Sequence, residues 1–144
     1  MKLRTIWNEK MRFTAKSSAH EIAMDAKRPI GEDSALNPKE LVLAGVSGCT
    51  GMDVVALLRK YRQPADSFEV EAETSLTEGY PAVFTKVSLR YIVKGKVDAE
   101  KLIEAVTLSQ TKYCGVSAMI AKAAPIEYAI ELNGEEIQRG NAHF

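Results

Sequence analysis

The feature that most constrains the fold is one long helical pattern between two blocks of short strands. The helix is expected to begin at Asn37, where asparagine can act as the cap, proline suits the next position, and Glu40 completes a capping box. The pattern continues to about Arg62 and stops before Pro64. Three glycines recur inside it: Gly45, Gly48 and Gly51. Since each costs about 1 kcal/mol relative to alanine, either the helix breaks there or another backbone packs very close.

Alternating apolar and polar residues predict strands on both sides of this helix. The alternation covers residues 3–7, 11–16, 20–25, 68–73, 83–94 and 126–132. Two shorter helices are expected before the last strand, one capped by Asp98 and one beginning at Ser109 or Thr111. Strands that come in blocks, rather than in strict alternation with helices, predict an α+β fold with antiparallel sheets.

The length and charge of the chain exclude several classes of protein. Its 144 residues fit a single domain, 1–144. Nineteen basic and nineteen acidic residues balance to net zero, which argues against a strongly basic nucleic-acid binder, and no basic run marks a polybasic membrane anchor. The apolar stretches are interrupted by charged residues or glycine, and the first residues do not resemble a signal peptide. We therefore expect no membrane span and a cytoplasmic location.

The two cysteines are the residues best suited to chemistry. In a reducing compartment, Cys49 and Cys114 can be core residues, metal ligands or redox groups. With only His20 and His143 as nitrogen donors and no C-x-x-C pair, we expect no metal site and no cofactor. Both cysteines lie near expected helix starts, which favour the thiolate form. Spacing alone leaves core packing and redox chemistry both open.

Two segments carry a specific resemblance. The first contains N-P-x-E-L, A-G and S-G-C within one helix, over residues 37–54, and the second is the cysteine segment 112–117. Both resemble the OsmC/Ohr family of osmotically inducible and organic-hydroperoxide-resistance proteins, and the order of the elements agrees over nearly the whole chain. The resemblance implies an OsmC-like fold, with antiparallel sheets packed on central helices. It also implies an intertwined homodimer with the two-cysteine sites at the subunit interface.

The resemblance further implies a thiol-dependent peroxidase of oxidative stress defence. In such proteins the first cysteine attacks an organic or inorganic hydroperoxide and becomes a sulfenic acid. The second cysteine condenses with it to a disulfide, and a dithiol reductant restores both thiols. Cys49 and Cys114 occupy these two positions. The alternatives are a non-catalytic, stress-associated binding dimer of the same fold, and a purely structural use of both cysteines.

Two positions depart from the pattern of the peroxidases that the chain resembles. Those proteins carry a carboxylate directly after the N-P pair, where it orients an arginine against the reactive thiol. This chain has Lys39 there, and Glu40, one residue later, lies about 100° further round the helix. Gly115 follows Cys114 where a proline is common.

The supporting arginine is expected from the N-terminal strands or the loop after them. Arg12 and Arg28 are the candidates, and Arg12 is preferred because it lies near the first turn. A solvated strand position for Arg12, and a helix-start role for Glu40, are the alternatives. The candidate catalytic residues are Cys49, Cys114, Arg12 and Glu40.

Overall fold

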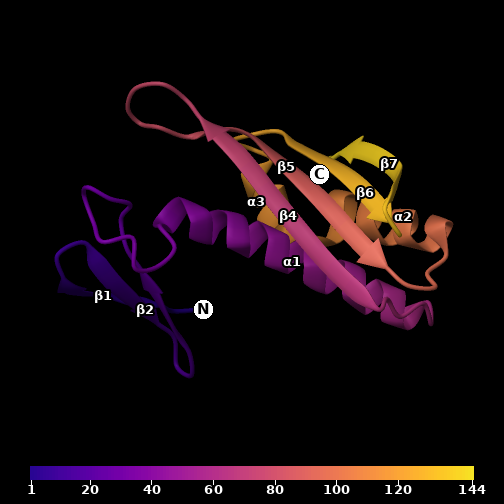
Figure 1. Ribbon diagram of the computed structural model, residues 1–144, viewed down its shortest axis with the longest axis horizontal. Coiled ribbons are helices and arrows are strands. Elements are labelled where there is room, and N and C mark those ends of the chain that lie inside the picture. Colours follow the sequence, from indigo (N-terminus) through magenta and orange to yellow (C-terminus); the bar gives the residue numbers. More distant parts are fainter. The chain divides into compact units, whose positions relative to one another are not determined.

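A computed structural model describes all residues from Met1 to Phe144. The chain forms two compact units, Met1–Leu43 and Ala44–Phe144. The first contains a three-stranded sheet, and the second contains a four-stranded sheet with helices along one of its faces (Figure 1). The long helix α1 (Pro38–Lys60) begins in the first unit and continues into the second.

The first unit is a small antiparallel sheet followed by a loop. The alternation predicted its strands β1 (Arg4–Glu9), β2 (Arg12–Lys16) and β3 (Glu21–Met24), which pair in chain order. The sheet buries little of its apolar surface. Trp7, for example, is 62% exposed. Such exposure is typical of a surface that packs against another chain or segment.

The predicted capping box at the start of α1 is confirmed. The Asn37 Oδ1 atom accepts hydrogen bonds from the backbone N–H groups of Lys39, at 2.9 Å, and Glu40, at 3.0 Å. In return, the Glu40 carboxylate accepts one from the Asn37 N–H at 2.8 Å. These bonds satisfy N–H groups that have no partner within the helix.

Asn37→Ala is expected to lower the free energy of unfolding by about 1 kcal/mol, because it removes the cap that satisfies two N–H groups. Urea denaturation followed by circular dichroism measures this loss. Lys39→Ala is the matched control, since its side chain makes no capping bond. Equal midpoints for Asn37→Ala and the wild type would contradict the assigned cap.

Helix α1 is continuous through its glycines, so the first of the two alternatives, a break in the helix, is not seen. No neighbouring heavy atom lies within 4 Å of the positions that a Cβ would occupy at Gly45 or Gly48. The other alternative, close approach of another backbone, is therefore not seen at these two glycines. At Gly51 the nearest atoms belong to the side chains of Phe68 and Val70, at 3.5 and 3.6 Å. Gly51 thus faces β4, where an added Cβ would make ordinary van der Waals contacts, whereas Gly45 and Gly48 face open space.

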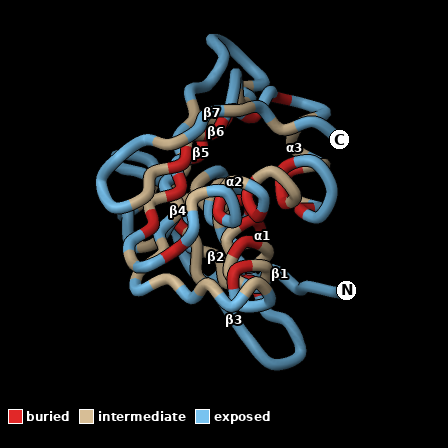
Figure 2. The backbone as a smooth tube through the Cα atoms, turned by 90° about the vertical axis from the view of Figure 1, so that its right-hand side faces the viewer, coloured by how far each residue is buried: buried red, intermediate tan, exposed pale blue.

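The second unit is built on a four-stranded sheet. Its strands β4 (Ser67–Leu76), β5 (Phe84–Lys94), β6 (Ile126–Leu132) and β7 (Glu135–Asn141) pair in that order. The predicted alternation of β5 is confirmed. Its inner face is fully or almost fully buried through Val87, Leu89, Tyr91 and Val93. Buried residues concentrate on these strands and on the facing sides of the helices (Figure 2).

The helical connection between β5 and β6 makes the sheet mixed, which corrects the expectation of antiparallel sheets. It comprises α2 (Ala99–Leu108), a π-helical turn η1 (Ser109–Tyr113) and α3 (Gly115–Ile120). The predicted Asp98 cap of α2 is confirmed by a 3.0 Å bond from the Lys101 N–H. Because this connection returns the chain to the end of the sheet where β5 begins, β5 and β6 pair in parallel.

Strand β7 was missed by the sequence analysis. Its residues, EEIQRGN, are mostly polar and exposed, so they lack the alternation that marks a half-buried strand. A tight turn joins it to β6. Asn133 and Gly134 have φ values of 53° and 89°, as the tight turn of a β-hairpin requires.

By length and composition alone, α1 is apolar enough to cross a membrane. A helix of this length and hydropathy was not expected, because glycines interrupt the apolar segment, although they do not make it polar. One side of α1 is nevertheless buried in the protein, through Val46, Thr50, Val54 and Leu58. These residues follow one another at intervals of four, which is the pattern of a helix that packs on a core.

Candidate functional site

The structure brings the two cysteines together in the second unit. Cys49 lies on α1 and is half-buried, and Cys114 precedes α3 and is fully buried. Their sulfur atoms and one carboxylate oxygen of Asp53 all lie within 4.8 Å of one another. Asp53 follows Cys49 by four residues, so both side chains lie on the same face of α1. Two thiols and a carboxylate thus share one small site.

Cys114 is held at a break between two helical turns. The segment Ser109–Tyr113 forms a π-helical turn, and Cys114 is extended, with φ −71° and ψ 97°. The predicted helix start at Ser109 or Thr111 is therefore wrong, because a wider turn occupies that segment. Cys114 is the N-cap of α3, and its sulfur accepts a hydrogen bond from the Ser117 N–H at 3.3 Å. Such π-turns are frequent at functional sites.

The surroundings of Cys114 favour its protonated form. Burial raises the pKa of the Cys114 thiol, and the adjacent Cys49 thiol raises it further. Hydrogen bonds from Ser117 act in the opposite direction but do not reverse the shift. Cys114 is therefore better suited to remain a protonated thiol than to act as the attacking thiolate.

A buried polar network lies next to the two sulfurs. Thr50 shares hydrogen bonds with the hydroxyls of Tyr91, at 2.6 Å, and Ser109, at 2.7 Å. The Ser109 hydroxyl also donates to the Asp53 carboxylate at 3.0 Å. Burial raises the pKa of Tyr91 well above its usual value, so this phenol stays protonated. The network therefore orients Asp53 through a chain of neutral hydroxyls.

Gln110 joins the network from the π-helical turn. Its amide nitrogen lies 2.9 Å from the hydroxyl oxygens of both Thr50 and Tyr91, and 3.2 Å from that of Ser117. Its amide oxygen is buried and has no hydrogen-bond partner. The side chain thus connects α1, β5 and α3 around the Cys114 sulfur.

Thr50→Val is expected to lower the free energy of unfolding by about 1–3 kcal/mol, because buried hydroxyls and the Gln110 amide lose a partner. Urea denaturation measures the loss. The matched control is Thr85→Val, an exposed position on β5 where the change should stay within about 0.5 kcal/mol. If the Thr50→Val protein is as stable as the control, the network does not contribute to the free energy of unfolding.

Sequence reasoning missed Asp53 and the polar network. The signal for Asp53 was its position four residues after Cys49, on the same helical face. The signal for the network was a set of polar residues inside otherwise apolar helices: Thr50, Ser109 and Gln110. A buried polar residue usually means a satisfied hydrogen-bond network, and here that network lies beside the thiols.

The other candidate residues belong to the first unit, whereas both cysteines belong to the second. Arg12 is exposed on β2, and the Arg28 side chain donates to the Glu32 carbonyl at 3.2 Å. Glu40 forms an ion pair with Lys27 at 3.0 Å rather than with either arginine. The Asn37 N–H and Lys27 together hold the pKa of Glu40 below its usual value. The catalytic roles of Arg12 and Glu40 stay predictions.

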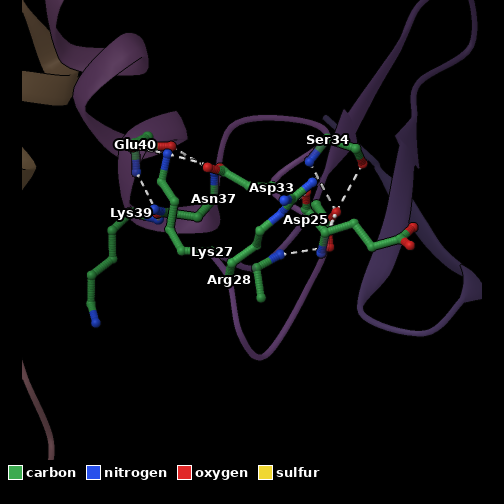
Figure 3. A network of polar contacts seen from close by, with 10 residues as sticks. Asp25, Lys27, Arg28, Asp33, Ser34, Asn37, Lys39 and Glu40 are labelled. Atoms are coloured by element: carbon green, nitrogen blue, oxygen red, sulfur yellow. Dashed lines mark hydrogen bonds and ion pairs between the residues drawn. The ribbon is translucent and has the colours of Figure 1, made fainter.

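The loop before α1 is organised around a buried carboxylate that sequence reasoning also missed. Asp25 accepts hydrogen bonds from the Ser34 hydroxyl, at 2.8 Å, and from the backbone N–H groups of Ala26 and Ser34 (Figure 3). These bonds lower the pKa of Asp25. Lys39, which replaces the expected carboxylate, extends away from this network (Figure 3). The loop therefore has a fixed shape of its own.

Comparisons with known proteins give a consistent result. Residues 31–129 match the family described as OsmC-like protein. Protein YhfA of Escherichia coli K12 is 37% identical over 134 residues, which cover 92% of this chain and 98% of YhfA. A hypothetical protein from Aquifex aeolicus superposes with a TM-score of 0.83 at 29% identity, over 94% of this chain and 97% of that protein.

A more distant structure carries a functional description. It is a putative organic hydroperoxide resistance protein from Vibrio cholerae with captopril bound in one of its active sites. It superposes with a TM-score of 0.63 at 15% identity, over 95% of this chain and 94% of that one. At this identity the likeness shows a common fold.

Proposed function

This chain belongs to the OsmC-like family, and we propose that it is a thiol-dependent peroxidase that reduces organic or inorganic hydroperoxides. The observation that carries the proposal is the proximity of two sulfurs from distant segments. Cys49 and Cys114 are 65 positions apart in the chain, yet their sulfur atoms lie within 4.8 Å. One side of α1 packs on the core of the second unit, and we propose a cytoplasmic role in oxidative stress defence.

The reaction follows from the chemistry of two neighbouring thiols. The Cys49 thiolate attacks one peroxide oxygen, the O–O bond breaks, and an alcohol or water leaves with a proton. The resulting sulfenic acid is attacked by Cys114, which forms the disulfide and releases water. A dithiol reductant then returns both cysteines to thiols by exchange. Each cycle converts one hydroperoxide and one dithiol into an alcohol, water and an oxidised dithiol.

The environments of the two cysteines support this division of roles. Cys49 is half-buried and therefore within reach of a small peroxide, whereas Cys114 is fully buried. The raised pKa of Cys114 favours its neutral form until the sulfenic acid appears beside it. Arg12 is proposed, on the resemblance alone, to supply positive charge to the reacting oxygen atoms.

We propose that the protein acts as a homodimer and that α1 lies in the interface. One face of α1 is open, and it includes Gly45, Gly48 and Met52, the last of which is 76% exposed. Met119 on α3 adds a further apolar side chain that is 67% exposed. Small residues on a helix let a second chain approach closely, and the apolar side chains beside them gain from burial.

A second candidate function, a non-catalytic binding dimer of the same fold, has one observation in its favour. The Glu40 carboxylate is already engaged by Asn37 and Lys27, so the arginine–carboxylate pair of the peroxidases has no counterpart here. Turnover of cumene hydroperoxide or hydrogen peroxide with a dithiol distinguishes the two candidates. A peroxidase consumes the peroxide through Cys49, whereas a binding protein leaves it unchanged.

A further inference from the structure

The sequence predicted no metal site, but the donor groups that the structure brings together suit a metal ion. Two cysteine sulfurs and an Asp53 oxygen converge within 4.8 Å, and Asp53 forms no ion pair with a lysine or arginine. We propose that Cys49, Asp53 and Cys114 bind a thiophilic divalent cation, with Zn²⁺ as the representative ion. Two thiolates and a carboxylate carry three negative charges, of which a divalent cation would offset two.

The distances fit a tetrahedral site. Zinc binds sulfur at about 2.3 Å and carboxylate oxygen at about 2.0–2.2 Å, so donors around one ion lie roughly 3.5–3.8 Å apart. The three donor atoms already lie within 4.8 Å of one another. Small side-chain rotations therefore close the site. The i, i+4 spacing of Cys49 and Asp53 places two of the donors on one helical face.

Hydrogen bonds from neighbouring residues already orient two of the three donors. The Ser109 hydroxyl donates to the Oδ2 atom of Asp53 at 3.0 Å, which leaves the other carboxylate oxygen for a metal. The Ser117 N–H donates to the Cys114 sulfur at 3.3 Å. Such outer contacts orient metal ligands and commonly change affinity by about 10–100-fold.

The donor set also selects the type of cation. Magnesium and calcium prefer sites made of oxygen alone, whereas two thiolates favour zinc and cadmium. Three protein ligands leave a fourth position for water, as in open zinc sites. Cys49 is only half-buried, so the cluster is not sealed from solvent. Binding releases the two thiol protons to the solvent.

Metal binding and peroxide reduction use the same sulfurs. A Cys49–Cys114 disulfide has no thiolate to offer, so only the reduced protein can hold the cation. An occupied site in turn withholds Cys49 from peroxide until the metal leaves. This inference depends on the proximity of the donors and does not require that the protein turn over peroxide.

The test is titration of the fully reduced protein with Zn²⁺ in the absence of oxygen, measured by competition with a chromophoric chelator. We expect one equivalent per chain, and an affinity at least tenfold lower for Asp53→Asn, which keeps both thiols. Asp66→Asn is the matched control, because Asp66 lies outside the cluster. Circular dichroism checks that each variant is folded.

A second measurement identifies the ligands directly. Co²⁺ in place of Zn²⁺ should give a near-ultraviolet thiolate-to-cobalt band, together with the intense visible bands of a tetrahedral ion. Absence of stoichiometric binding, or equal affinity of Asp53→Asn and the wild type, overturns the proposal. A protein that forms the disulfide with peroxide but binds no metal refutes only this inference. One that binds metal but consumes no peroxide refutes only the proposed function.

Discussion

Cys49→Ser is expected to abolish consumption of cumene hydroperoxide and hydrogen peroxide, a loss of several orders of magnitude relative to wild type. A serine hydroxyl is not ionised at neutral pH and cannot form a sulfenic acid, so the first step of the cycle is lost. The measurement is peroxide disappearance in the presence of a dithiol. Thr111→Ser is the control, because Thr111 is exposed and its change leaves both sulfurs in place.

Cys114→Ser is expected to behave differently, because the attacking sulfur remains. One equivalent of peroxide should convert Cys49 to a sulfenic acid, and excess peroxide should then carry it to irreversibly oxidised forms. Intact mass spectrometry separates these outcomes. The wild type should lose two hydrogens as the Cys49–Cys114 disulfide forms, and Cys114→Ser should gain oxygen. Two free thiols that survive excess peroxide in the wild type would favour the binding dimer.

Much of the fold followed from local signals in the sequence. The period-two alternation located six of the seven strands because apolar and polar residues alternate along each of them. The caps at Asn37 and Asp98 were recognisable because each depends on residues within three positions. Strand β7 was missed because it is largely exposed, and its polar residues carry no alternation.

The features that were not predicted depend on long-range packing. The parallel pairing of β5 and β6 is determined by the path of the helical connection, not by the residues of either strand. The π-helical turn that places Cys114 at the start of α3 has no pattern of its own in the sequence. The continuity of α1 through its glycines reflects tertiary packing, since Val46 and Val54 are fully buried on the opposite side.

The candidate site was predicted in part. The segments around Cys49 and Cys114 identified the two sulfurs, and the structure brings them together. Asp53 was overlooked because a carboxylate on an amphipathic helix is usually a solvated residue. Its carboxylate is oriented by Ser109, which is 56 positions away and reaches it only in the folded chain. The prediction that the chain has no metal site rested on its few histidines and on the absence of a C-x-x-C pair. The observed cluster contains neither a histidine nor a C-x-x-C pair, so that criterion did not detect it.

Gly48→Gln is expected to weaken the proposed homodimer by on the order of 30-fold or more. The glycine faces open space in the single chain, so the larger side chain meets no atom of its own chain within 4 Å of its Cβ. Within one chain the change should favour the helix by several tenths of a kcal/mol up to about 1 kcal/mol, because glutamine is the better helix former. Any loss of association therefore comes from the interface.

The size of the effect follows from symmetry. Inserting a side chain into a packed interface costs about 1–3 kcal/mol, and a two-fold dimer contains the substitution twice. A total of about 2–6 kcal/mol corresponds to at least a 30-fold increase in the dissociation constant. Sedimentation equilibrium at several protein concentrations measures this constant, and Gly48→Ala, which adds a single methyl group, should show a smaller loss.

The same variant tests where the reactive centre lies. Cys49 and Cys114 approach each other within one chain, so a monomeric Gly48→Gln protein should still form the disulfide with one equivalent of peroxide. If turnover falls while this single oxidation persists, the partner subunit supplies a group needed for repeated cycles. A wild type that sediments as a 15.8 kDa monomer at micromolar concentration would refute the dimer. The open face of α1 would then be a solvent-exposed surface, and a single chain would have to carry out every step of the cycle.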